Sequence, residues 1–164
     1  MRRVAVLIAC IVGLVVLPSF AAEQDKTRLE ENKAIVRGYI NDVINKGSLE
    51  AFDKYFSEKV VFNNSPGFRA GLSSLIQSLR SGFPDFQVTI EDQIAEGDKV
   101  VTRVKFHGTH RGEYRGVAPT GKVIEYPGIA IDRIADGKVV EMWHIAESTV
   151  ILRELGFSVS PPKP

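Results

Sequence analysis

The sequence predicts an α+β domain: a cone-shaped barrel in which three helices of the N-terminal half pack in a strongly curved, mainly antiparallel sheet. Apolar residues before Pro84 recur with the period of about 3.6 residues that is typical of helices. After Pro84 they alternate with polar residues, as in strands that bury one face. Helices followed by antiparallel strands indicate the α+β class. A curved sheet backed by helices encloses a cavity that suits a small ligand.

Capping and periodicity place the helices. Thr27 and Glu30 have the spacing of a capping box, so the first helix is expected over about 27–46. Ser48 is a suitable N-cap for a second, shorter helix, whose apolar residues are Leu49, Phe52, Tyr55 and Phe56. A third helix is expected from Gly71 to the Phe83-Pro84 step, with apolar residues at positions 72, 75, 76, 79 and 83.

Five segments are expected to be strands. The first is short, over 60–62, and four alternating segments follow at about 86–90, 100–107, 123–135 and 138–145. The last two are separated by Asp136-Gly137, which is a strong signal for a tight hairpin. The end of the chain, 158–164, contains three prolines and is expected to be a solvated tail.

The composition fits one globular domain and has no excess of positive charge that would attract a polyanion. The chain has 164 residues, of which 44% are hydrophobic and 25% charged, and 21 basic residues face 20 acidic ones, for a formal net charge of +1. Nucleic-acid binding needs a basic patch or stripe, which such a balance does not favour. We therefore expect no nucleic-acid partner.

The first 22 residues read as a secretory signal peptide. Arg2 and Arg3 are followed by the almost wholly apolar segment 4–17, and Ser19 and Ala21 have the −3 and −1 spacing of a cleavage site. We expect cleavage after Ala21 and export to the periplasm or the medium, with no stable membrane anchor afterwards.

Two alternatives to cleavage are a retained anchor, for which the apolar run is short, and lipidation at Cys10. The expected organisation is a signal peptide over 1–21, a folded domain over 22–157 and the tail over 158–164.

The sequence gives no support for a metal or organic cofactor. Cleavage would remove Cys10, the single cysteine, and with it disulfides, thiol catalysis and thiolate ligands. His107 and His110 are three apart, so a strand would place them on opposite faces. Glycine-rich phosphate loops, His-Glu-x-x-His and Gly-x-Ser-x-Gly are absent. We therefore expect neither a metal site nor a cofactor.

Several short blocks occur in the order found in a known family. They are Phe83-Pro84-Asp85-Phe86, Gly97-Asp98-Lys99-Val100, Gly108-Thr109-His110-Arg111-Gly112-Glu113-Tyr114, Pro119-Thr120-Gly121-Lys122, Arg133 to Trp143 and Leu152-Arg153-Glu154-Leu155-Gly156. With these blocks the chain resembles the SnoaL-like polyketide cyclases, also called predicted ester cyclases, over roughly residues 30–157. The resemblance implies the nuclear transport factor 2-like fold, a cone-shaped α+β barrel that hosts enzymes and binding domains alike.

The resemblance also implies a catalytic residue. Family cyclases are thought to close a ring by intramolecular aldol condensation without a cofactor, using a buried carboxylate as acid and base. The family pattern has an aspartate four positions after the tryptophan of the last strand, where this chain has Glu147 after Trp143. A base works best with a pKa near 7, and burial in an apolar cavity raises the pKa of a carboxyl group toward that value. Glu147 is therefore expected at the inner end of the cavity. The alternative is that Glu147 caps a helix starting near Ser148 or faces solvent.

Four other residues are candidates for the site. His110 stands where a strand enters the 112–121 loop and could donate to an oxyanion, or it could only stabilise the loop. Arg133 lies on the same face of its strand as Ile129 and Ile131, so it would point into the interior if they do. At the edge of the sheet, its stem would instead lie along apolar surface while the guanidinium stays in water. Substrate contacts are also expected from Trp143, which could equally be core, and from Asn63 at the cavity mouth.

The sequence therefore predicts an exported, cofactor-independent enzyme of the cyclase or isomerase type. Glu147 and His110 are its predicted catalytic residues, and Asn63, Arg133 and Trp143 its predicted substrate contacts. The substrate would be a small carbonyl- or ester-bearing compound. The alternative is a non-catalytic ligand-binding or dimeric interaction module of the same fold. A homodimer formed through an exposed sheet face is expected in either case.

Overall fold

The computed structural model describes residues 16–66 and 68–156. Its helical elements are α1 (Val16–Tyr39), the π-helix η1 (Ile40–Asn45), the 3-10 helix η2 (Leu49–Ala51), α2 (Phe52–Tyr55), α3 (Phe68–Gly82) and α4 (Thr149–Glu154). Its strands are β1 (Phe56–Phe62), β2 (Gln87–Glu96), β3 (Lys99–Thr109), β4 (Val123–Ala135) and β5 (Lys138–Ala146). The predicted tail and the first 15 residues of the predicted signal peptide lie outside the described residues.

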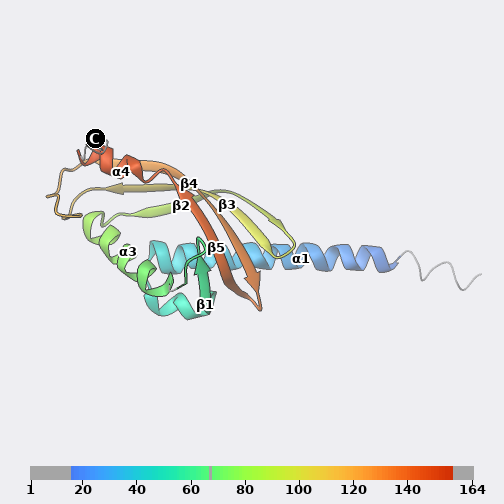
Figure 1. The fold of residues 1–164 in the computed structure, drawn as a ribbon. Coiled ribbons are helices and arrows are strands. Elements are labelled where there is room, and N and C mark those ends of the chain that lie inside the picture. Colours follow the sequence, from blue (N-terminus) through green and yellow to red (C-terminus); the bar gives the residue numbers. More distant parts are fainter. Residues whose placement is uncertain (1–15, 67, 157–164) are drawn as a thin grey trace, which may run out of the picture.

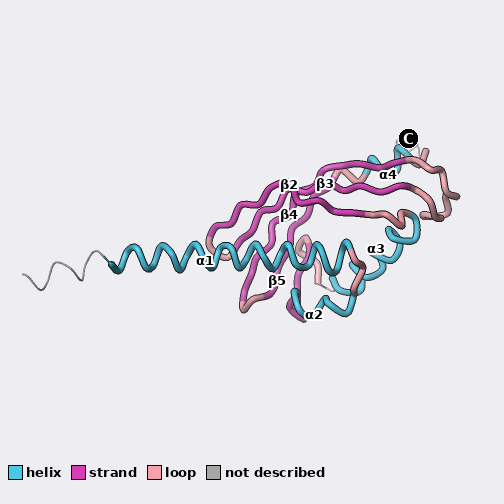
Figure 2. Tube along the Cα trace, turned by 180° about the vertical axis from the view of Figure 1, so that it is seen from behind, coloured by secondary structure: helices cyan, strands magenta, loops and turns pink. Residues whose placement is uncertain are grey.

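The strands form one mixed sheet in the order β1-β5-β4-β3-β2. Strand β1 runs parallel to β5, and the other neighbours are antiparallel. The sheet curls over α1 and α3, as Figure 1 and the reverse view in Figure 2 show. This arrangement confirms the predicted α+β fold, with helices of the N-terminal half packed against a curved sheet.

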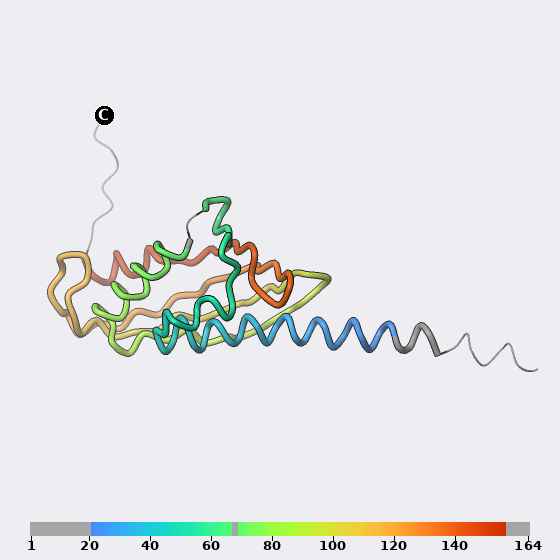
Figure 3. Tube along the Cα trace, turned by 90° about the horizontal axis from the view of Figure 1, so that it is seen from below, coloured from blue at the N-terminus to red at the C-terminus, as the bar shows by residue number. Residues whose placement is uncertain are grey.

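Helix α1 begins earlier than the capping box predicts. Thr27 lies inside α1, and its hydroxyl donates to the carbonyl of Glu23 at 3.0 Å. A threonine in a helix can bond the carbonyl of the preceding turn, so its presence did not mark a helix start. The first part of α1 projects beyond the sheet (Figure 3). Among the described residues, no helix is both long and apolar enough to cross a membrane.

The second predicted helix is shorter than expected because Phe56 belongs to β1. Phe56 has extended backbone angles and pairs with Val139 of β5. Its ring stacks on that of Phe52 at a centroid distance of 4.4 Å. Parallel pairing with the edge of the sheet thus draws the chain out of the helix four residues before the predicted strand start.

The core lies between the helices and the inner face of the sheet. Even-numbered residues of β3 and β4 point inward and are buried, while their odd-numbered neighbours point outward. Among the described residues, four polar ones are buried with the apolar core: Asn32, Thr102, His110 and Asp132. Asp132 is thus an acid on the inner face of the sheet.

Candidate functional site

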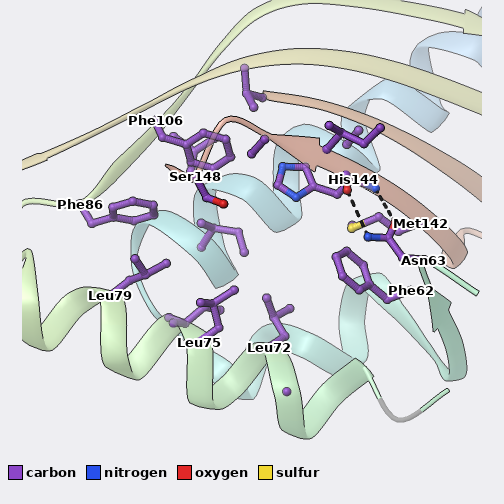
Figure 4. A pocket seen from close by; sticks show the side chains of 18 of the residues that line it. Phe62, Asn63, Leu72, Leu75, Leu79, Phe86, Phe106, Met142, His144 and Ser148 are labelled. Atoms are coloured by element: carbon purple, nitrogen blue, oxygen red, sulfur yellow. Dashed lines mark hydrogen bonds between the residues drawn. The ribbon is translucent and has the colours of Figure 1, made fainter. Parts of the chain in front are cut away.

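A cavity of about 810 Å³ lies between α3 and the inner face of the sheet. Its walls are largely apolar, and Figure 4 shows leucines of α3 facing aromatic side chains of the strands across it. The labelled wall residues include Leu72, Leu75, Leu79, Phe86 and Phe106. A cavity of this size and lining suits a small, mainly apolar ligand.

His144 on β5 places an imidazole among these apolar side chains (Figure 4). The ring meets Phe106 edge to face at 5.7 Å and lies 6.5 Å from the ring of Phe62. Burial lowers the pKa of His144, so the ring is neutral at neutral pH. Neither ring nitrogen has a hydrogen-bond partner among the described residues. A neutral imidazole of this kind can accept a proton from a ligand.

Asn63 holds the backbone of His144 in place. Its amide nitrogen donates to the carbonyl of His144 at 3.1 Å, and its amide oxygen accepts from the His144 N–H at 2.9 Å. The N–H of Asn63 also donates to the carbonyl of Met142 at 2.9 Å. Asn63 has a positive φ of 45°, a conformation that asparagine tolerates better than most residues. The turn after β1 is therefore fastened to β5 at the histidine.

Gly128 on β4 leaves room for the imidazole. A Cβ at this position would lie 3.2 Å from Nε2 of His144 and 2.7 Å from the ring of Phe106. The glycine therefore lets the two rings pack directly over the β4 backbone.

Tyrosine hydroxyls and one guanidinium supply further polarity. Tyr126 stacks on Phe106 at 4.7 Å, and burial raises the pKa of Tyr126, which keeps its hydroxyl protonated. Tyr39 and Tyr114 also line the cavity, and Arg115 stands on a tight turn at its edge. No aspartate or glutamate is among the described residues that line it.

Glu147 lies elsewhere than predicted. Its side chain is exposed and is not among the residues that line the cavity. Its backbone N–H donates to the carbonyl of Pro127 at 3.2 Å, and it lies two residues before α4, next to the N-cap residue Ser148. The expected position at the inner end of the cavity was wrong, whereas a role for Glu147 in catalysis stays a prediction.

His110 is fully buried at the base of the 111–121 loop and does not line the cavity. The backbone N–H of Thr120 donates to Nδ1 of His110 at 3.2 Å, and the backbone N–H of His110 donates to the carbonyl of Lys122. These bonds tie the two ends of the loop together. Its predicted catalytic role is not tested by this placement.

Arg133 and Trp143 share the outer face of the sheet. Ile129 and Ile131 point outward, so the condition for an inward Arg133 is not met. Nε of Arg133 donates to a carboxylate oxygen of Glu141 at 3.0 Å. Trp143 pairs with Ile131 and is not among the cavity-lining residues. Of the five predicted site residues, Asn63 is the one that lines the cavity.

A bulge explains why sequence reasoning missed His144. A regular two-residue hairpin at Asp136-Gly137 would pair Ala130 with Trp143 and turn the tryptophan inward. The register instead shifts between Arg133 and Ile134, so Ala130 pairs with His144. One extra residue in β5 thus exchanges its two faces. Only the lack of alternation at Val139-Val140 hints at this in the sequence.

Within residues 16–66 and 68–156, no group of three or more His, Asp or Glu side chains is arranged to hold a metal ion. The polar side-chain groups gathered at the cavity are an imidazole, a guanidinium, hydroxyls and the amide of Asn63. Such groups can transfer protons and bind a carbonyl oxygen.

Comparisons with known proteins identify one family and two similar solved structures, of which AclR is described as a putative hydroxylase and IdmH as a putative polyketide cyclase. The family model of the SnoaL-like polyketide cyclase matches residues 34–155. AclR from Streptomyces galilaeus is 30% identical, with a TM-score of 0.71, over 82% of this chain and 87% of AclR. IdmH from Streptomyces antibioticus is 29% identical, with a TM-score of 0.68, over 76% of this chain and 98% of IdmH. No curated protein matches the chain.

Proposed function

Since the chain belongs to the SnoaL-like polyketide cyclase family, which supports a cyclase- or isomerase-type function, we propose that it is a cofactor-independent acid-base enzyme. Its substrate is a small, mainly apolar carbonyl or ester compound bound in the cavity. The observation that carries the proposal is the neutral imidazole of His144, which lies in an apolar cavity with unpaired ring nitrogens.

His144 acts as the base in this proposal. Its imidazole takes a proton from the carbon next to a substrate carbonyl, which leaves an enolate. In a cyclase reaction the enolate carbon then bonds to a second carbonyl carbon of the same molecule, and the resulting alkoxide takes a proton back from the imidazolium. In an isomerase reaction the same proton returns to a different carbon. Both reactions begin with the same proton removal.

Proton removal can be tested without the natural substrate. We expect the purified protein to accelerate exchange of the α-hydrogens of 2-tetralone, a bicyclic ketone, in D₂O as followed by proton NMR. His144→Gln keeps a similar shape but cannot act as a base, so the acceleration should fall by about 100-fold or more. Glu147→Gln is the matched control and should keep it within about twofold.

The opposite outcome would favour the sequence-based assignment. If Glu147→Gln loses the exchange and His144→Gln keeps it, Glu147 is the base. The wild-type rate should also decline on acidification, at a pH below the ordinary histidine pKa of about 6.5, because burial lowers the pKa at which His144 becomes protonated. A rate that is independent of His144 and of pH in this range contradicts the proposal.

A second candidate is a non-catalytic carrier of small apolar ligands. It is favoured by the absence of any carboxylate among the described residues that line the cavity. A carrier would bind 2-tetralone but would leave its α-hydrogen exchange at the rate of buffer. The same NMR experiment therefore separates the two functions.

Export remains part of the proposed function. It rests on Arg2, Arg3, the apolar run and the small residues before Ala22, while a cut after Ala21 would remove the first six residues of α1. Mass spectrometry of protein recovered outside the cytoplasm should give a chain that begins at Ala22. A chain that still carries Arg2, or one that begins with a lipidated Cys10, would contradict this prediction.

A further inference from the structure

Asp132 is a buried acid that the proposed proton transfer by His144 does not use. It is fully inaccessible to solvent, and both its carboxyl oxygens lie near the hydroxyl of Tyr39, at 3.2 and 3.4 Å. The register places Val100 of β3 and Met142 of β5 beside it, and neither can titrate or donate from its side chain. Tyr39 is the one side-chain partner of this acid in the described part of the chain.

No cation of the described residues pairs with Asp132. On α1, Lys33 and Arg37 pair with Glu30, and on the outer face of the sheet Arg133 pairs with Glu141. Burial raises the pKa of Asp132 to about 7, despite the bond from Tyr39. The acid therefore carries its proton over much of the range below neutral pH.

The Tyr39–Asp132 pair adjoins the imidazole. Tyr39 lines the cavity from α1. Asp132 pairs with Met142, and Ala130 pairs with His144, so Asp132 and His144 are diagonal neighbours on the inner face of the sheet. Diagonal neighbours on one face are about 7–8 Å apart, so the Tyr39–Asp132 pair and the imidazole belong to the same region of the inner face.

The protonation state of Asp132 decides where the Tyr39 hydroxyl can donate. An ionised carboxylate only accepts, so it takes the tyrosine proton. A protonated carboxyl donates its own proton to Oη of Tyr39, which frees the tyrosine proton for another acceptor. Tyr39 lines the cavity, where a bound ligand can supply such an acceptor.

We propose that Tyr39 and protonated Asp132 form the carbonyl-binding donor of the cavity, in which Asp132 donates to Tyr39 and Tyr39 donates to the substrate oxygen. The inference rests on the proposed function and adds the site of the oxygen to it. Tyr39 is then a catalytic residue that stabilises the enolate oxygen, and Asp132 is a positioning residue. Substrates of this site carry a carbonyl oxygen opposite the carbon that His144 deprotonates.

The test uses binding and infrared spectroscopy rather than turnover. The probes are 2-tetralone and its hydrocarbon counterpart tetralin, neither of which titrates. In wild type, the carbonyl stretch of bound 2-tetralone should move to lower frequency because of a hydrogen bond. Tyr39→Phe should abolish this movement and reduce the preference for 2-tetralone over tetralin by about three- to tenfold.

Tyr55→Phe is the matched control. Tyr55 also donates to an aspartate, Asp42, but it does not line the cavity. Removing its hydroxyl should leave the carbonyl stretch and the ligand preference unchanged. A general loosening of the fold through a lost Tyr–Asp bond would affect both variants alike.

The pH dependence tests Asp132 itself. In wild type the shifted carbonyl band should disappear as the pH rises through about 7, because ionised Asp132 retains the tyrosine proton. In Asp132→Asn the band should persist at high pH, because the asparagine amide donates to Tyr39 at every pH. A purely structural Asp132 would not produce this rescue.

Two results would overturn the inference: an unshifted carbonyl band in wild type, or a shifted band that Tyr39→Phe retains. His144→Gln should keep the shifted band while it loses hydrogen exchange. A shifted band without any exchange in wild type would therefore refute the proposed function alone. Exchange that depends on His144 but not on Tyr39 would refute the inference alone.

Discussion

Two titratable side chains on the inner face of the sheet respond to burial in opposite ways. Burial lowers the pKa of His144 and raises the pKa of Asp132, because in both cases it disfavours the charged form. Both residues are therefore predominantly neutral just below pH 7. A neutral base in the cavity, and a neutral acid that bonds the cavity-lining Tyr39, are a pair that suits enolate chemistry.

The acid has a measurable effect on stability. The unfolded chain releases the Asp132 proton near pH 4, whereas the folded chain holds it up to about pH 7. The folded state binds more protons between these values, so the contribution of Asp132 to the free energy of unfolding falls as the pH rises through them. At pH 8, Asp132→Asn should be more stable than wild type by about 2–4 kcal/mol, with little difference at pH 4.

Chemical denaturation of both proteins at several pH values measures this difference. Asp85→Asn is a control for which the stability difference from wild type at pH 8 should have the opposite sign. The backbone N–H and hydroxyl of Thr109 donate to Asp85, and the backbone bond lowers the pKa of Asp85, so its stabilising contribution is present above about pH 4 and lost on acidification. Asp85→Asn should therefore lose stability at pH 8. Equal curves for Asp132→Asn and wild type would show that Asp132 is not buried as described.

At the scale of the elements, β4 and β5 together position the imidazole. The shift in register between Arg133 and Ile134 turns His144 inward, and Gly128 leaves space above the β4 backbone for its ring. The Asn63 amide then fixes the β5 backbone from the turn after β1. Three segments distant in sequence thus determine the orientation of one side chain.

Gly128→Ala should disturb this arrangement without removing any titratable group. The new methyl would lie 2.7 Å from the ring of Phe106 and 3.2 Å from Nε2 of His144. Both rings must move, so we expect α-hydrogen exchange to fall by about tenfold or more and stability by about 1–3 kcal/mol.

Gly108→Ala on β3 is the control for this substitution. Its methyl would lie 3.1 Å from Cβ of Phe83, and Gly108 does not line the cavity. It should cost stability while exchange by the folded protein is retained. Thermal denaturation and NMR exchange measure the two effects, and an unimpaired Gly128→Ala would show that the imidazole needs no such space.

At the scale of the whole molecule, the outer face of the sheet carries an apolar row. Val101 pairs with Ile131, which pairs with Trp143, so these side chains lie side by side across β3, β4 and β5. Val101 is 37% exposed and Ile131 36%. Contiguous exposed apolar residues can form a contact surface, and we propose that this row is the surface of the homodimer expected from the sequence.

Ile131→Lys should convert such a dimer to a monomer, because it places a charge at the centre of the apolar row. Val123→Lys is the matched control. It introduces the same charge at an exposed site on the same strand, about 26 Å away along β4. Sedimentation velocity should show a dimer for wild type and Val123→Lys, and a monomer for Ile131→Lys. A monomeric wild type would refute the proposed homodimer.

The sequence alone determined the class of fold and the family. Its periodicities identified the helices and strands, because amphipathic patterns follow local geometry. The blocks between Phe83 and Gly156 indicated the family, which the match over residues 34–155 confirms. The start of α1 and the end of the second helix were wrong, since a capping residue and an aromatic run are compatible with more than one local structure.

Only the tertiary structure decided which side chains share the cavity. A one-residue bulge exchanged the faces of β5, so His144 entered the cavity and Trp143 turned outward. The apolar residues of β4 occur on both faces, so sequence could not show that Asp132 points inward and Ile131 outward. A strand has two faces of equal local geometry, and pairing and packing with distant segments select between them.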